Sequence, residues 1–364
     1  MVQVSRNDAA YQVTAQPATV GKIAVVRVNG LGDLMFAFPA LQALRETFKE
    51  AEIILLAKAW HRDFLEGRSG PVDRVVVVPP TPGVGIAPDL PGDPEASAAF
   101  FRAMRAEQFD IAIQLHGGGA HSNPFTKALG ARVTVGLHDA DAAPLDRGFP
   151  FVYYQPEILR CLEVVGLVGA KTAEISPKIT VTEHDIREAE AAVPGGDSPL
   201  VALHAGATDP RRRWPPEHFA AVSRAIARAG YTPVLTGMDD ERDLTANIAR
   251  IAGEPVADTA GRLSTGGLAG LLSRCRLLIS NDSGPLHLAA AVGMRTVGIY
   301  WVGNLINGGP VTREMHRPVL SWRLDCPACG RGIGLPRCEH NDSFVADVSV
   351  DEVLGQSFAL LGEA

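Results

Sequence analysis

Short apolar runs alternate with helix-like segments along most of the chain, and this alternation restricts the possible folds more than any other feature. The short runs suit buried strands, and the longer segments between them suit crossover helices. Strands that alternate with helices predict a parallel, doubly wound α/β sheet. In the first half the strand-like runs are 21–28, 51–57, 72–79, 109–116 and 131–137, and the clearest helical patterns are 34–48 and 96–108.

A second series of the same kind begins at 199–206 and continues to a helical segment that ends near Gly293. A chain of 364 residues is longer than one ordinary core requires. We therefore expect two Rossmann-like domains that face a cleft, the first over 1–185 and the second over 186–345. Residues 346–364 are expected to form a helix that packs back on the N-terminal domain.

The charge balance argues against a nucleic-acid-binding surface, because 34 Lys and Arg face 41 Asp and Glu, a net charge of −7. No apolar run reaches the roughly 18 residues of a membrane span, and the irregular N-terminal arm lacks the pattern of a signal peptide. We therefore expect a cytoplasmic protein.

Ligands of open α/β sheets bind beyond the carboxyl ends of the strands. The loops that follow Val28, His116, Leu203, Leu235 and Ile279 are therefore expected to line the cleft. Most of the candidate functional residues discussed below lie in these loops.

The segment LLISNDSGPLHLAAAVG passes from an apolar strand through small and polar residues into a helix. Ser283 suits an N-cap and Pro285 suits the first helical turn, so simple capping is one interpretation. Capping does not explain Asp282, or His287 one turn inside the helix. The free N–H groups of a helix N-terminus also form an anion site, to which His287 can add a hydrogen bond. We favour phosphate binding here.

The loop NGLGD follows the first strand directly and ends in Asp33. Its glycines lack the spacing of a dinucleotide fingerprint, and no Gly-Lys-Ser/Thr follows, so hydride transfer and ATP hydrolysis lose support. Asp33 is either a capping carboxylate at a helix start or a general base that faces the cleft.

Three consecutive arginines at 211–213 lie between a strand end and a Trp-Pro-Pro helix start. Charge runs are usually solvated surfaces, but guanidinium groups at this place could also hold a diphosphate by paired hydrogen bonds. These residues alone do not decide between the two. In the turn LTGMDDERD, Glu241 is placed to accept hydrogen bonds from ribose hydroxyls.

Together these segments resemble glycosyltransferase family nine, the heptosyltransferase family, from about residue 22 to 355. The motifs that carry the resemblance are VRVNGLGDLMFAFPAL, RRRWPP, LTGMDDE and, most specifically, DSGPLHLAA. The resemblance implies the GT-B fold, with an acceptor-binding N-terminal domain and a domain for a nucleotide-sugar donor.

The resemblance also implies roles for particular residues. Asp33 matches the catalytic base, Arg212 or Arg213 a basic residue against the diphosphate, and Glu241 a contact to the nucleoside. The donor-binding helix start is matched by Asp282, Ser283, Gly284 and His287.

One loop departs from the family pattern. After the last strand of the resemblance, family members commonly continue with a Gly-Pro-Thr-like loop, whereas this chain has YWVGNLINGGP, with Trp301, Asn304 and Asn307. The loop borders the expected donor site, so the sugar and the base of the donor stay open.

The expected activity is inverting, metal-independent transfer of a sugar, with heptose from ADP-heptose as the first expectation. It needs no cofactor: Asp33 removes the proton of an acceptor hydroxyl, and hydrogen-bond donors stabilise the departing diphosphate. The resemblance implies a lipopolysaccharide core or another cell-envelope glycan as acceptor, reached at the inner face of the membrane. Two alternatives are a sugar-nucleotide-binding protein without catalysis and a GT-B-type sugar-nucleotide epimerase.

The acceptor site is the least defined part. The polar candidates on the N-terminal loops are His61, Arg62, His116, Ser122 and Asn123, with Arg62, His116 and Asn123 carried forward as acceptor-binding residues. The Pro- and Gly-rich loop 79–95 is irregular, and its role is open.

Three of the five cysteines cluster near the C-terminus, in CPACGRGIGLPRCEH. Cys326, Cys329, Cys338 and His340 have a spacing that could hold tetrahedral zinc or iron. A second Cys pair is missing, and similar segments of the resembled family mostly lack an established metal role. We favour reduced thiols or a local disulfide.

Overall fold

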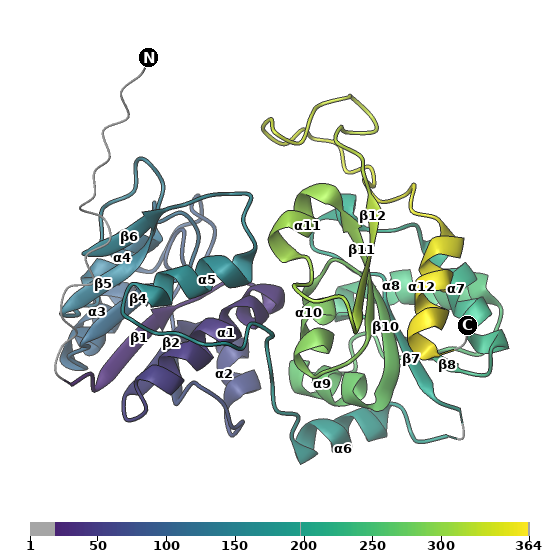
Figure 1. Cartoon of the computed structure of the whole chain (residues 1–364), viewed down its shortest axis with the longest axis horizontal. Helices are drawn as coiled ribbons and strands as arrows, with labels where there is room; N and C mark the ends of the chain where they lie inside the picture. The colour runs from purple at the N-terminus through teal and green to yellow at the C-terminus, as the bar shows by residue number, and fades with distance from the viewer. Residues whose placement is uncertain (1–18, 197, 363–364) are drawn as a thin grey trace.

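Two parallel sheets of six strands form the centre of the molecule (Figure 1). The computed structural model describes residues 19–196 and 198–362, so most of the predicted N-terminal arm lies outside the described residues. The strand orders are β3-β2-β1-β4-β5-β6 and β12-β11-β10-β7-β8-β9. If each sheet is numbered from its own first strand, both follow the doubly wound order 3-2-1-4-5-6. The predicted fold class is confirmed.

The first sheet and its helices occupy residues 22–166. Its strands are β1 (Lys22–Val26), β2 (Glu52–Ala57), β3 (Arg74–Val77), β4 (Ile111–Gln114), β5 (Val133–His138) and β6 (Arg147–Pro150), and the last of these was not predicted. Its helices are α1 (Leu31–Thr47), α2 (Ala59–Leu65), α3 (Pro94–Ala106), α4 (Ser122–Ala128) and α5 (Glu157–Gly166).

The second sheet repeats this arrangement. Its strands are β7 (Leu200–His204), β8 (Thr232–Thr236), β9 (Ala257–Asp258), β10 (Cys275–Asn281), β11 (Thr296–Trp301) and β12 (His316–Ser321). The helices around it are α6 (Glu183–Ala192), α7 (Pro216–Arg228), α8 (Arg242–Ala252), α9 (Thr265–Arg274), α10 (Gly284–Ala291), α11 (Val302–Gly308) and α12 (Val350–Leu361), with short 3₁₀ turns η2 (Pro210–Arg212) and η3 (Asp239–Glu241).

The central strands are buried on both faces, which explains their continuous apolar sequences. Residues 23–26 of β1 and 277–279 of β10 are fully buried. Helices α3 and α4 cover the outer face of the first sheet, and α7, α8 and α12 cover the outer face of the second. Between the sheets, α1 packs on α10 within one hydrophobic cluster that draws residues from both sheets. Helices α1 and α10 therefore form the main contact between the two halves of the chain.

The C-terminal helix corrects one prediction. α12 does not pack back on the N-terminal domain but contacts α7, β10 and β11 of the second sheet. Val353 and Leu360 enter the hydrophobic cluster on the outer face of that sheet. The apolar side of α12 is therefore satisfied within its own half of the chain.

The division into 1–185 and 186–345 stays a prediction, but the position of one helix bears on it. α6 spans the expected boundary, and it packs against α9 of the second sheet. Most contacts of α6 group it with the second half, although Arg68 of the first half pairs with Asp185 of α6 at 2.7 Å. These contacts favour a boundary in the segment between α5 and α6.

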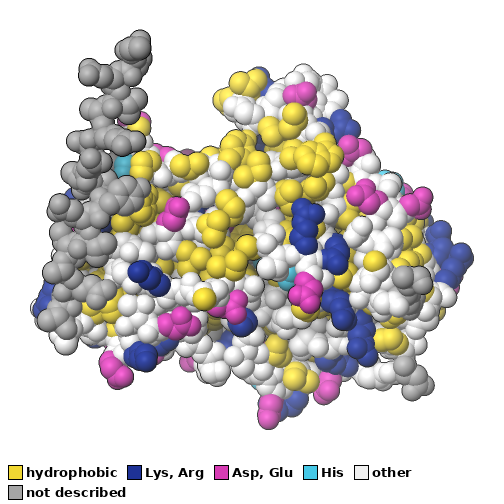
Figure 2. Space-filling model, viewed as in Figure 1, with side chains coloured by type: hydrophobic (Ala, Val, Ile, Leu, Met, Phe, Trp, Pro, Cys, Tyr) yellow, Lys and Arg dark blue, Asp and Glu magenta, His cyan; other side chains and the backbone are white. Residues whose placement is uncertain are grey.

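A long irregular loop after β12 projects from the second half of the chain (Figure 1). Figure 2 shows hydrophobic side chains on this projection and a hollow in the surface beside it. Within the described residues, no helix is both long and apolar enough to cross a bilayer. The expected cytoplasmic location and contact with the inner membrane stay predictions.

Candidate functional site

A cavity of about 300 Å³ lies where the two halves of the chain meet, and we call it the interdomain cavity. It combines the loop after β1, the start of α5, the loop after β7, the start of α10 and helix α11. The lining residues are Gly30, Leu31, Gly32, Asp33, Phe36, Glu157, Thr208, Arg212, Asp282, Ser283, Gly284, His287, Asn304, Asn307 and Gly308. Asp33 and the start of α10, which the sequence places about 250 residues apart, therefore share one cavity.

Two glycines allow this close approach of the halves. A Cβ atom at Gly32 would lie 2.8 Å from Cδ2 of His287, and one at Gly284 would lie 2.9 Å from Cβ of Leu31. Both separations are shorter than van der Waals contact, so larger residues would force the loop and the helix apart. The glycines set the distance across the cavity.

Asp33 caps the start of its helix and also lines the interdomain cavity, and its role as a general base stays a prediction. It lies in the first turn of α1, and its Oδ2 accepts the Gly30 N–H at 3.1 Å, which is a capping bond. Its side chain is nevertheless 41% exposed and lines the interdomain cavity. The capping bond uses one carboxylate oxygen, and the side chain stays accessible to a ligand.

Arg27 and Glu157 hold Asp33 from behind, and neither was identified from the sequence. The Arg27 guanidinium lies 3.1 Å from Oδ1 of Asp33 and 2.9 Å from Oε1 of Glu157, and its Nε donates to the Asp33 carbonyl. Arg27 is only 2% exposed. It ends an apolar strand segment, and Glu157 lies 130 residues further on, so no local pattern connected them.

The start of α10 is open toward the interdomain cavity. Ser283 is the N-cap residue in extended conformation, as predicted, but its side chain makes no capping hydrogen bond. Pro285 in the first turn has no N–H to satisfy. The Leu286 N–H donates to the Ser283 carbonyl at 3.1 Å. The backbone N–H groups of Ser283 and Gly284 are therefore the candidates for binding a ligand, in the positive potential of the helix end.

Asp282 is the centre of a polar network just behind this helix start. Its carboxylate accepts from His287 Nε2 at 3.2 Å, from Asn304 Nδ2 at 2.8 Å and from Arg212 at 3.3 Å. Burial acts most strongly and opposes ionisation, yet the His287 hydrogen bond, the Arg212 charge and the Asn304 amide together hold the pKa of Asp282 below its usual range. The charged carboxylate thus orients three side chains that line the cavity.

Asn281 connects the arginine segment 211–213 to this network. Its Nδ2 donates to the carbonyl of Ala205 at 2.7 Å, and its Oδ1 accepts the Trp214 N–H at 3.0 Å. The Trp214 ring is buried and donates to the Val348 carbonyl at 2.9 Å. The Trp-Pro-Pro start is therefore an anchor that fixes the arginines beside α10.

The structure separates the three arginines. Arg212 lines the interdomain cavity, whereas Arg211 pairs with Asp209 at 2.6 Å. Arg213 donates to the Ala207 carbonyl at 2.9 Å and does not line this cavity, so its predicted contact with the diphosphate stays a prediction.

Glu241 lies apart from the interdomain cavity, at the carboxyl ends of β7 and β8. Its Oε2 accepts the Met238 N–H at 2.8 Å, and the carboxylate rests on the backbone of Gly206, where a Cβ atom would overlap it. The predicted contact with a nucleoside stays a prediction.

A second cavity of about 360 Å³ reaches Asp33 from the N-terminal side, and we call it the N-terminal cavity. It is lined by Asn29, Lys58, His116 and the segment 83–88. The irregular loop 79–95 therefore forms part of a wall, and Asp33 lies between two cavities. Lys58 was not identified from the sequence, because an isolated lysine before a helix carries no pattern.

Of the three acceptor candidates, only His116 lines this second cavity. Its Nδ1 accepts the Val28 N–H at 3.3 Å, and burial, followed by the charge of Arg27, lowers the pKa of His116 to about 4. Asn123 is wholly buried and donates to two backbone carbonyls, so it is structural. Arg62 is half-exposed and pairs with Asp63. The prediction is wrong for Asn123, and Arg62 lies outside the cavity.

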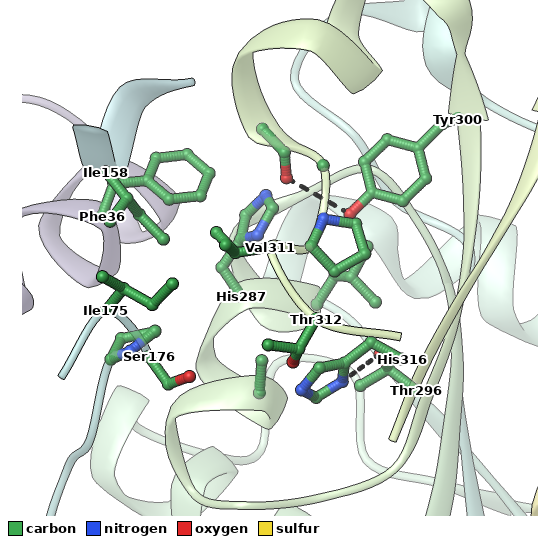
Figure 3. Close-up of a pocket in the computed structure, with 16 residues that line it drawn as sticks. Phe36, Ile158, Ile175, Ser176, His287, Thr296, Tyr300, Val311, Thr312 and His316 are labelled. Carbon is green, nitrogen blue, oxygen red and sulfur yellow. Dashed lines mark hydrogen bonds between the residues drawn. The ribbon is translucent and has the colours of Figure 1, made fainter. Parts of the chain in front are cut away.

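A third, small cavity of about 60 Å³ lies on the other side of His287 (Figure 3). Phe36, Ile158 and Ile175 face it from the N-terminal side, and Tyr300 and Val311 from the other. Its volume holds only a few waters. Its apolar lining makes it a packing gap rather than a substrate site.

The four residues of the cysteine cluster lie together in the projecting loop. One potential ligand atom from each of Cys326, Cys329, Cys338 and His340 lies within 4.8 Å of the others. All five cysteines are free thiols in the structure, so the local disulfide that we considered is not formed.

The paired Rossmann-like sheets and the cavity between them define the chain as a protein of the GT-B class. Residues 97–324 match the family described as glycosyltransferase family 9 (heptosyltransferase). The chain belongs to this family, as the sequence resemblance predicted.

Several known proteins are similar over most of the chain. Lipopolysaccharide heptosyltransferase 2 of Salmonella typhimurium is 24% identical over 303 residues, 77% of this chain and 82% of the relative. A family 9 glycosyl transferase structure from Veillonella parvula superposes with a TM-score of 0.76 at 20% identity, covering 95% and 98% of the two chains. The structure of E. coli ADP-heptose lps heptosyltransferase II gives 0.73 at 17% identity, with 94% and 99% covered.

Proposed function

We propose that this chain transfers a heptose from ADP-heptose to a lipopolysaccharide-core type of glycan, with inversion at the transferred carbon. The observation that carries the proposal is the shared interdomain cavity, which has a carboxylate on one wall and an open helix N-terminus on the other. The names of the relatives support the sugar and the acceptor.

In this scheme the donor diphosphate lies against the N–H groups of Ser283 and Gly284, with Arg212 beside it. These donors stabilise the negative charge that develops as ADP departs, each by roughly 3 kcal/mol. The phosphate leaves as an anion, so no protonated side chain has to assist it. This arrangement supplies the charge stabilisation from the chain itself and does not call on a catalytic metal.

The nucleoside extends from the start of α10 toward Glu241, whose carboxylate lies against the backbone of Gly206. Asn304 and Asn307 line the same cavity and are placed to contact the sugar. Both lie in helix α11, within the segment that departs from the family pattern, so we propose that they select the donor sugar.

The acceptor enters through the N-terminal cavity, beside Lys58 and His116. Asp33 then takes the proton of its hydroxyl while that oxygen attacks the donor carbon. Because Asp33 lies between the two cavities, attack comes from the face opposite the diphosphate, and the configuration inverts.

The test is to incubate the protein with ADP-heptose, with and without a heptose-acceptor core glycan, and to measure released ADP and extended glycan. A transferase releases ADP in proportion to the extended glycan, and only when acceptor is present. A binding protein releases no ADP in either reaction. An epimerase converts the sugar nucleotide without acceptor, and either of these last two results would overturn the proposal.

A further inference from the structure

The loop between β12 and α12 brings three thiols and an imidazole to one point. Potential ligand atoms of Cys326, Cys329, Cys338 and His340 all lie within 4.8 Å of one another. In a tetrahedral site with metal–ligand bonds of about 2.0–2.3 Å, neighbouring ligand atoms are about 3.5–3.8 Å apart. Small side-chain rotations therefore bring all four atoms to bonding distance around one ion.

The backbone between Cys326 and Arg331 forms a tight turn that carries the first two of these cysteines. The Gly330 N–H donates to the Cys326 carbonyl at 2.9 Å, and the Cys326 N–H donates to the Arg331 carbonyl at 2.9 Å. Gly330 has a φ of +69°, a left-handed conformation that a glycine adopts without strain. This tight turn places the thiols of Cys326 and Cys329 on one side.

The loop packs on the outer hydrophobic cluster at Cys326 and again at Phe344 and Val345, but the part between Cys326 and Phe344 is mostly exposed. No helix or regular strand of the described chain lies between Ser321, where β12 ends, and Val350, where α12 begins. Leu335 is 61% exposed and Trp322 is 70% exposed, so these apolar side chains add little packing. Irregular segments of this length are uncommon in compact domains unless something holds them. Metal ligation is one way to supply that stability.

The loop also lies near the interdomain cavity. It forms one wall of a neighbouring cavity of about 370 Å³, to which Arg331 and Arg337 contribute. Arg212 and Asn304 line both this cavity and the interdomain cavity. An ordered loop therefore keeps two additional cations close to the site.

We propose that Cys326, Cys329, Cys338 and His340 bind one divalent transition metal in a tetrahedral Cys3His site. Four protein ligands fill the coordination sphere, so the ion is structural and holds the loop in place. Thiolate and imidazole ligands suit zinc and ferrous iron, and the thiol protons are released to solvent on binding. The proposal stands independently of the transfer reaction.

The test measures the metal content of the full chain, purified under reducing conditions, by mass spectrometry of the elements. We expect about one zinc or iron per chain, and the elemental analysis identifies which. Cys329→Ser and Cys338→Ser should lower the content to less than about a tenth, while Cys275→Ser, a free cysteine outside the loop, should keep it. His340→Asn and the exposed His184→Asn form a second matched pair. Cys326 is left intact because it is buried in the core.

Two further measurements keep the proposal testable if the metal is lost during purification. Cobalt added to the reduced protein should give the intense visible bands of tetrahedral thiolate ligation, which Cys338→Ser should abolish. Metal removal should also speed cleavage by trypsin after Arg331 and Arg337 at least tenfold, and added zinc should reverse this. A wild-type protein with neither zinc nor iron, no cobalt bands and unchanged proteolysis would overturn the proposal.

Discussion

The buried guanidinium of Arg27 lies 3.1 Å from Oδ1 of Asp33 and also bonds the backbone carbonyl of Asp33. The exposed carboxylate that faces the interdomain cavity is therefore fixed by a cation that no substrate can reach. The same guanidinium nitrogen, Nη2, also donates to Oε1 of Glu157 at 2.9 Å. Asp33 is thus oriented through a charged network that reaches from β1 to α5.

This arrangement predicts that Arg27→Lys lowers kcat by roughly 10- to 100-fold, because lysine keeps the charge but cannot bond both carboxylates and the carbonyl in one plane. The KM for ADP-heptose should change little, since Arg27 does not line the cavity. Steady-state kinetics test this, with the exposed Arg132→Lys as control. A rise in KM of roughly 10- to 100-fold with no loss of kcat would show that Arg27 does not position Asp33.

The separation of the neighbouring arginines gives a second prediction. Arg212→Ala should weaken ADP binding by roughly 10- to 100-fold, because a charged hydrogen-bond donor is removed from the cavity. Arg213→Ala should change the affinity less than about twofold, since Arg213 bonds a backbone carbonyl outside it. Calorimetry with ADP compares the two variants. Equal losses would place the diphosphate elsewhere.

The sequence predicts the parts of the site that lie within one strand-loop-helix unit. Asp33, Asp282 and Ser283 each follow a buried strand directly, so the rule for carboxyl ends placed them correctly at the cleft. Arg27 and Glu157 were missed because their contact depends on how α5 packs on α1, which local patterns do not encode.

Predictions also failed where the burial of a side chain, or the element on which a helix packs, determined its position. Asn123 was carried forward as a loop residue that binds the acceptor, but it lies in the first turn of α4 and donates to backbone carbonyls in the interior. The C-terminal helix has an apolar side that either half of the chain could have covered. Only the packing against α7 and the second sheet decides between them.

A third prediction concerns acid stability. The pKa of His116 is lowered to about 4 from its ordinary value of 6.5, so the folded state favours the neutral ring. The stability due to this group is fully present above pH 6.5 and is lost as the pH falls toward 4, by about 3 kcal/mol at most.

His116→Asn should retain the acceptor for the Val28 N–H but remove this titration. Urea unfolding between pH 7 and pH 4 should therefore show a smaller loss of stability in the variant than in the wild type. Other buried histidines such as His61 titrate in both proteins and cancel in the difference. Parallel pH curves would contradict the assignment.

The most direct test of the account is Asp33→Asn, measured for both transfer and donor binding. Transfer from ADP-heptose to the core glycan should fall by roughly 10²- to 10⁴-fold, because the amide cannot accept the hydroxyl proton. Affinity for ADP-heptose should stay nearly unchanged in calorimetry, since we propose that the diphosphate binds the opposite wall. Asp351→Asn, which changes another aspartate in the first turn of a helix, should leave both unaffected. An Asp33→Asn enzyme that transfers heptose at the wild-type rate would contradict the central claim.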